Sequence, residues 1–132
     1  MIQLVPHIRI LLAIAPVDFR KGADTLAALC KEQLSEDPYS GTLFVFRNRR
    51  GTALKLLIYD GVGFWLCWRR FSQGKLRWWP QAADATAHLH SLAAQQLSAL
   101  LYNANPMEMR FAPDWKPLAQ PQAASLSGAP RA

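Results

Sequence analysis

Between residues 41 and 79, short runs of strand-forming residues alternate with turns, and this pattern restricts the fold more than any other feature of the chain. The predicted strands are 42–47, 53–59, 64–71 and 75–79. The turns between them are rich in Gly, Asn, Asp and Ser, which favour tight reversals of the chain. Connections this short join neighbouring strands that run in opposite directions. The segment therefore predicts an antiparallel meander sheet.

A strand and a helix are expected before this segment. Residues 8–14 form a short apolar run between two prolines, which is typical of a strand. The next residues with helical spacing are Leu26, Leu29, Cys30, Gln33 and Leu34. We expect Asp18 to cap the N-terminus of this helix, and the helix to end before Asp37, which precedes a proline.

A second helix is expected after the sheet, because leucines recur there at helical spacing. Its apolar face holds Leu89, Leu92, Ala93, Gln96, Leu97, Leu100 and Leu101. Ser91 is the expected N-cap, and the residues 103–106, which end in proline, stop the helix. Residues 81–88 before it are small and polar and are expected to form a loop.

These elements predict an α+β fold in the order β-α-β-β-β-β-α, with an antiparallel meander sheet of about four to five strands packed with two helices. The chain has 132 residues, 51% of them hydrophobic, which suffices for one domain with its own core. We assign residues 1–115 to this single domain. Residues 116–132, rich in Pro, Ala and Gln, are predicted to form a disordered tail.

The sequence favours a cytoplasmic protein. The longest apolar runs fall short of the ~20 residues that a membrane span needs, and the N-terminal run lacks the basic leader of a signal peptide. Cys30 and Cys67 lie in apolar surroundings without metal-ligand spacing. Free thiols are therefore favoured over a disulfide between them.

Positive charge is concentrated in one part of the sequence. The whole chain carries a formal net charge of +6, while segment 47–79 alone holds eight basic residues against one acid, Asp60. Aromatic residues are interleaved with them. Because arginine pairs with phosphates and flat rings stack on bases, we predict DNA as the partner, bound through a basic surface of the sheet. The candidate contacts are Arg20, Lys21, Arg47, Arg49, Arg50, Lys55, Arg69, Arg70, Lys75 and Arg77.

Catalytic chemistry has little support in the sequence. Metal-dependent nucleases need two or three carboxylates around their ions. We interpret Asp18 as a helix cap and Asp60 as a turn residue instead. A metal site made by these two aspartates is the enzymatic alternative. His88 and His90 suggest zinc only weakly, since no carboxylate or cysteine accompanies them. We expect a protein that is not an enzyme and has no catalytic residues, metal site or cofactor.

Several segments are also similar to one known family. They are Asp18–Gly22, Asp37–Gly51, Tyr59–Leu66 and Gly74–Trp78. This string resembles the TnpB-type accessory protein of the insertion sequence 66 family of bacterial transposons, over about residues 8–105. The resemblance implies a non-catalytic protein that is required for transposition beside a separate transposase, which carries the catalytic acids.

Two molecular roles are consistent with these features. The basic segment favours an accessory module that binds DNA, with transposon ends as the expected site. The aromatic residues and the apolar second helix favour a protein–protein adaptor that docks on the transposase without contacting DNA. The sequence leaves both roles open.

Overall fold

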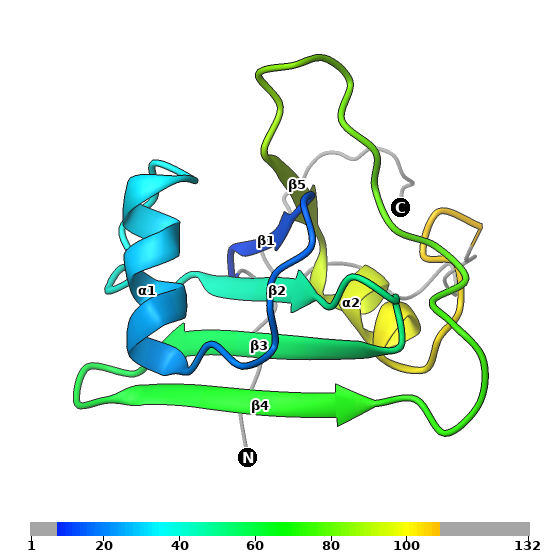
Figure 1. The fold of residues 1–132 in the computed structure, drawn as a ribbon, viewed down its shortest axis with the longest axis horizontal. Coiled ribbons are helices and arrows are strands. Elements are labelled where there is room, and N and C mark those ends of the chain that lie inside the picture. The colour runs from blue at the N-terminus through cyan, green and yellow to red at the C-terminus, as the bar shows by residue number, and fades with distance from the viewer. Residues whose placement is uncertain (1–7, 109–132) are drawn as a thin grey trace, which may run out of the picture.

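The structure, a computed structural model, describes residues 8–108 and is built around a five-stranded sheet (Figure 1). In chain order the elements are β1 (Ile10–Ala13), α1 (Ala23–Glu32), β2 (Leu43–Arg47), β3 (Ala53–Tyr59), β4 (Phe64–Arg70), β5 (Leu89–Leu92) and α2 (Ala94–Leu101). The strands lie in the order β4-β3-β2-β1-β5. The predicted α+β class and element order are confirmed, although the last strand comes from another segment than expected.

The sheet is mixed, so the prediction of a purely antiparallel meander is wrong. β1 runs parallel to β2, with Ile10 beside Leu43, whereas the other neighbouring strands are antiparallel. β1 and β2 run in parallel because α1 connects them. The chain leaves β1, forms α1 over one face of the sheet, and returns to enter β2 in the same direction (Figure 1). Only β2, β3 and β4 form the predicted meander.

The predicted strand 75–79 is absent. Its backbone groups bond instead to a turn and to a side chain: Leu76 N donates to Gly51 O (2.7 Å), and Arg77 N donates to Asn103 Oδ1 (2.9 Å). Trp78 and Trp79 pack against the core below the segment. Residues 75–79 therefore cover the sheet rather than extend it.

The fifth strand occupies residues that were predicted to begin the second helix. Leu89 and Leu92 pack in core clusters on opposite faces of the sheet, so their spacing of three residues fits a strand as well as a helix. α2 starts only at Ala94, and the prediction that Ser91 caps it is wrong. The N-cap position is Ala93, whose N–H donates to Gln96 Oε1 (2.9 Å).

Asp18 does not cap α1, contrary to the prediction, because the helix begins five residues later, at Ala23, with Gly22 as its N-cap. Its carboxylate accepts instead from the backbone N–H of Arg20 (2.9 Å) in a tight turn before the helix. The helix ends at Glu32, which confirms its predicted end before Asp37.

The core has two layers, one on each face of the sheet. On one face, α1 buries Leu26, Ala27 and Cys30 against the strands. On the other face, α2 buries Leu97 and Leu100, and residues of the 71–79 segment pack beside it. The central strands are buried on both faces for this reason, while β4 at the edge is largely exposed.

The predicted C-terminal tail and the end of the predicted domain at residue 115 lie outside the described residues. Within residues 8–108, neither helix has the length and apolar character that crossing a membrane requires.

Truncation of a core leucine tests this layered arrangement. Leu12 lies in the central strand pair and is fully buried. We expect Leu12→Ala to lower the free energy of unfolding by about 2–5 kcal/mol, through lost burial and the cavity left behind. Val62 is 93% exposed, so Val62→Ala is the control and should change it by less than about 0.5 kcal/mol. Urea titrations measure both, and equal effects of the two substitutions would contradict the fold.

Candidate nucleic-acid interface

The turn between β2 and β3 presents two arginines to solvent. Asn48 fixes this turn, because its Oδ1 accepts from the N–H groups of Thr52 (2.8 Å) and Ala53 (3.2 Å), and its Nδ2 donates to the Thr52 hydroxyl (2.8 Å). Gly51 takes a positive φ of 71° that suits glycine. Arg49 and Arg50 at the tip of the turn are both exposed.

The chain after β3 returns to the same end of the sheet. In the β3–β4 register Arg70 lies beside Ala53, and Phe71 N donates to Thr52 O (3.0 Å). Asn103 then holds the following segment, since its Nδ2 donates to Lys75 O (3.1 Å). We call the resulting group of positive side chains the basic end: Arg47, Arg49, Arg50, Arg69, Arg70, Lys75 and Arg77.

The basic end surrounds one end of the sheet and does not form a flat patch on one face. Strand alternation and the pairing register put Arg47 and Arg69 on the face covered by α2, and Arg70 on the face covered by α1. Arg69 is oriented by α2: its Nε donates to Leu101 O, and its guanidinium lies 5.3 Å from the Tyr102 ring centroid. The predicted sheet-face surface is therefore replaced by a cluster at the strand ends.

Arg47 is the least hydrated member of the basic end. It is half-buried, its guanidinium lies 5.9 Å from the Trp79 ring centroid, and its Nε is buried without a hydrogen-bond partner among the described residues. Burial, and then the neighbouring charge of Arg49, lower the pKa of Arg47. A guanidinium with an unused donor and little water gains strongly from a nearby anion.

Lys55, one of the predicted DNA contacts, is not on the surface. Its side chain lies under the loop before α1, where Nζ donates to the carbonyl oxygens of Phe19 (2.7 Å) and Lys21 (2.8 Å). The ammonium also lies 5.0 Å from the Phe19 ring and 5.1 Å from the Trp68 ring. Burial lowers the pKa of Lys55. Lys55 anchors the loop and cannot reach a phosphate, so it leaves the candidate set.

Arg20 and Lys21 lie on that loop and are not part of the basic end. Arg20 forms an ion pair with Asp18 (2.6 Å), and its hydrogen bonds hold the pKa of Asp18 at about 2. The positive charge of Arg20 is therefore largely balanced within the loop. The backbone of Lys21 contributes the carbonyl that receives Lys55.

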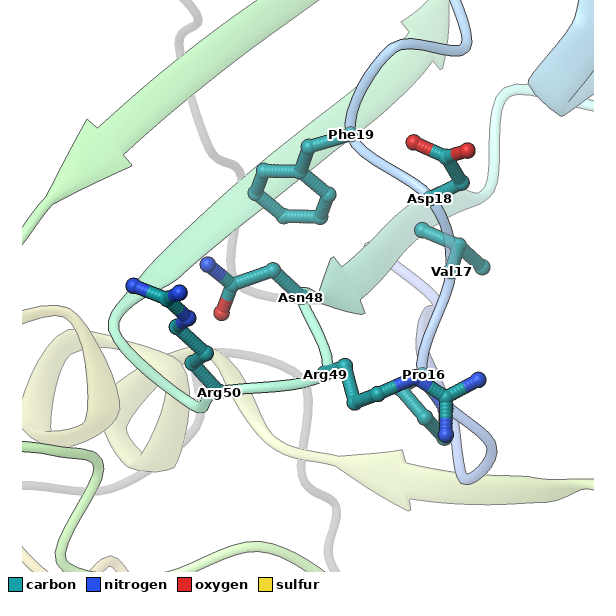
Figure 2. Close-up of a pocket in the computed structure, with 7 residues that line it drawn as sticks. All are labelled: Pro16, Val17, Asp18, Phe19, Asn48, Arg49 and Arg50. Carbon is teal, nitrogen blue, oxygen red and sulfur yellow. The ribbon is translucent and has the colours of Figure 1, made fainter.

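A hollow of about 360 Å³ separates this loop from the arginine turn. It is lined by Pro16, Val17, Asp18, Phe19, Asn48, Arg49 and Arg50. Figure 2 shows the Phe19 ring extending from its loop toward Asn48 in the arginine turn, while the carboxylate of Asp18 points away from both arginines. No local sequence pattern indicates this hollow, because its lining comes from segments about thirty residues apart.

An acidic residue lies at the opposite end of β3 and β4. Asp60 occupies the β3–β4 turn, where its Oδ1 accepts from the N–H groups of Val62 and Gly63 (both 2.9 Å) and its Oδ2 accepts from Trp65 Nε1 (2.9 Å). These hydrogen bonds lower the pKa of Asp60. Within residues 8–108 the ion pairs are Arg9–Glu36 and Arg20–Asp18. The basic end therefore has no ion-pair partner in this part of the chain.

The geometry does not favour the metal-site alternatives. Asp18 lies near the start of β3 and Asp60 follows its end, so the seven residues of the strand, about 20 Å long, separate them. Across the described residues no three His, Cys, Asp or Glu side chains gather as metal ligands. The ring of His90 packs edge-on against Trp78, with centroids 5.5 Å apart.

The two cysteines are free thiols on opposite faces of the sheet, as the sequence favoured. Cys30 is fully buried on the face of α1 that packs against the sheet, and burial raises its pKa to about 12. Cys67 lies in β4 and is half-buried. Cys30 is thus a packing residue with little thiolate at neutral pH.

Comparison with known proteins identifies the relatives of this chain. The family model described as IS66 Orf2-like protein matches residues 8–110. The chain belongs to the IS66 Orf2-like family. Two similar proteins are y4jC and y4hO of Sinorhizobium fredii (strain NBRC 101917 / NGR234), both described as uncharacterized. No solved structure matches the chain.

The two relatives are similar to more than half of this chain. The protein y4jC is 39% identical over 82 residues, which cover 62% of this chain and 69% of y4jC. The protein y4hO is 36% identical over 95 residues, which cover 72% of this chain and 79% of y4hO. The IS66 Orf2-like protein is thus a transposition-associated accessory protein, and the resemblance found in its sequence is confirmed.

The anchoring role of Lys55 can be tested by removing its charge at constant length. Lys55→Met leaves two carbonyl oxygens under the loop without their hydrogen-bond donor. We expect it to lower the free energy of unfolding by about 1–3 kcal/mol. Lys75 is exposed, so Lys75→Met is the matched control and should change it by less than about 0.5 kcal/mol. Thermal and urea unfolding measure the difference; a Lys55→Met protein as stable as the control would show that the anchor does not matter.

Proposed function

We propose that this IS66 Orf2-like protein binds DNA through its basic end, with transposon ends as the target, and acts as a non-catalytic accessory protein beside a separate transposase. The supporting observation is the gathering of seven positive side chains at one end of the sheet, none of them in an ion pair within residues 8–108. A cluster of unpaired arginines attracts a polyanion by simple electrostatics. Such a protein acts where the DNA lies, in the cytoplasm of a bacterium.

The shape of the basic end favours contacts with the phosphate backbone. Arg49 and Arg50 project from a rigid turn, and Arg70, Lys75 and Arg77 are exposed beside them. A protruding turn reaches phosphates on either side of a groove, whereas no helix or strand of the described fold offers a row of side chains to base edges at this end. The binding therefore depends on charge and salt more than on base sequence.

The adaptor role has its own supporting observation. Trp65 and Trp68 on the edge strand are 45% and 59% exposed, on opposite faces of the sheet. Large exposed aromatic side chains are frequent at the centre of protein interfaces. A protein that docks on the transposase through β4, and does not touch DNA, is the second candidate function.

Charge reversal at the arginine turn distinguishes the two roles. We expect the wild-type protein to shift a duplex of the element's end in a gel at low salt, with log affinity falling by roughly 0.9 per phosphate contacted for each unit of log salt concentration. Arg49→Glu with Arg50→Glu should abolish this shift. The control is Arg9→Glu with Lys31→Glu, which changes the net charge equally but lies away from the basic end.

Three outcomes decide between the proposals. Loss of the shift in the turn variant alone supports the basic end as the DNA contact. Equal losses in the turn variant and the control indicate attraction by net charge and contradict a defined interface. An unaltered protein that never shifts DNA but co-purifies with the transposase at high salt, after nuclease treatment, favours the adaptor.

A further inference from the structure

The outer edge of β4 has hydrogen-bonding groups that nothing in residues 8–108 uses. β4 is an edge strand of the sheet (Figure 1), and the register continues past it, since Phe71 N donates to Thr52 O. Hydrogen-bonded and non-hydrogen-bonded pairs alternate along an antiparallel ladder. The odd-numbered residues of β4 therefore turn their backbone groups toward β3. The even-numbered ones turn theirs outward: Phe64, Leu66, Trp68 and Arg70.

This edge lacks the features that keep sheet edges from pairing. It is seven residues long, contains no proline, and has a continuous register with β3 without a bulge. Its two charged residues lie at one end, and no lysine or acid interrupts the rest. Natural sheets protect exposed edges with charges, prolines or bulges. An unprotected edge of this length is suited to pairing with another strand.

We propose that the partner is a second copy of this chain, paired antiparallel along β4 about a two-fold axis at Cys67. In this register Leu66 lies opposite Trp68 of the other copy, and Phe64 lies opposite its Arg70. All four residues turn their backbone N–H and C=O groups away from β3, so these groups can form hydrogen bonds in complementary pairs. A two-fold axis brings identical surfaces together, and the sequence of β4 is self-complementary in this arrangement.

Charge complementarity favours the antiparallel direction. Parallel pairing would set the arginines at the end of one β4 beside those of the other. Antiparallel pairing places Arg70 beside an aromatic ring, close to the turn that carries Asp60 in the second copy, where its carboxylate is exposed. The pairing also places the two basic ends on opposite sides of the ten-stranded sheet, because the paired β4 strands run in opposite directions.

Because the proposed two-fold axis passes through the Cys67 pair, disulfide crosslinking tests this dimer directly. Cys67 would face Cys67 of the second copy in a non-hydrogen-bonded pair, where Cα atoms are about 4.5 Å apart, within the range of a disulfide. The full-length Cys30→Ser protein is treated with copper–phenanthroline. Each disulfide formed then passes two electrons to the copper(II) oxidant and releases two protons. We expect a covalent dimer on a non-reducing gel.

The control for this test is the Cys67→Ser protein, which keeps only the buried Cys30 and should stay uncrosslinked. Sedimentation velocity of the reduced, unaltered protein should show a dimer that forms with rising concentration. A folded protein that stays monomeric at its highest soluble concentration overturns the proposal. A dimer without a Cys67 crosslink overturns the register and the proposal with it.

A second pair of variants tests the backbone pairing itself. Trp68 is 59% exposed and its N–H faces outward, so proline at this position removes no hydrogen bond of the β3–β4 ladder. Trp68→Pro and Trp68→Ala lose the same ring, but only proline removes the N–H. Among variants with a native circular dichroism spectrum, we expect Trp68→Pro to raise the dimer dissociation constant about tenfold or more above that of Trp68→Ala. Equal dissociation constants would contradict pairing through this edge.

Discussion

Mutual repulsion among seven positive side chains is the constraint on the basic end of this protein. The hairpins β2–β3 and β3–β4 bring the end of β2, the start of β3 and the end of β4 together, and Asn48 and Asn103 hold the intervening turns with hydrogen bonds. At physiological salt such repulsion acts over roughly 8 Å, so it is felt within the cluster and not across the sheet. A polyanion relieves it, and this relief is the physical basis of the proposed DNA binding.

The local parts of the fold could be predicted from the sequence, and the long-range parts could not. The strand Ala53–Tyr59 was predicted with its observed bounds, because turn residues flank it on both sides. The parallel pairing of β1 with β2 depends on where α1 packs, which no local pattern reveals. Leu89 and Leu92 have a spacing that fits one face of a helix and also the two faces of a strand. The segment forms a strand because it pairs with the edge of β1, a long-range contact that the local sequence does not reveal.

The candidate site shows the same division between local and long-range information. Arginines close to turns, such as Arg49 and Arg50, were found because turns of a meander are exposed. Lys55 was misassigned, since strand alternation gives its face of the sheet but not the loop that covers that face. Asn48 and Asn103, which position the basic segments, were read only as turn or helix-stop residues. Their roles depend on side-chain hydrogen bonds formed after folding.

The most direct test of the central claim is to map the DNA contact on the protein by NMR. Amide chemical shifts of the ¹⁵N-labelled protein are followed while a short duplex of the element's end is added at low salt. We expect the largest shift changes in residues 47–52 and 69–77, while residues 60–63 in the β3–β4 turn stay unchanged. Binding with its largest changes at residues 60–66, or spread evenly over the surface, would contradict that claim.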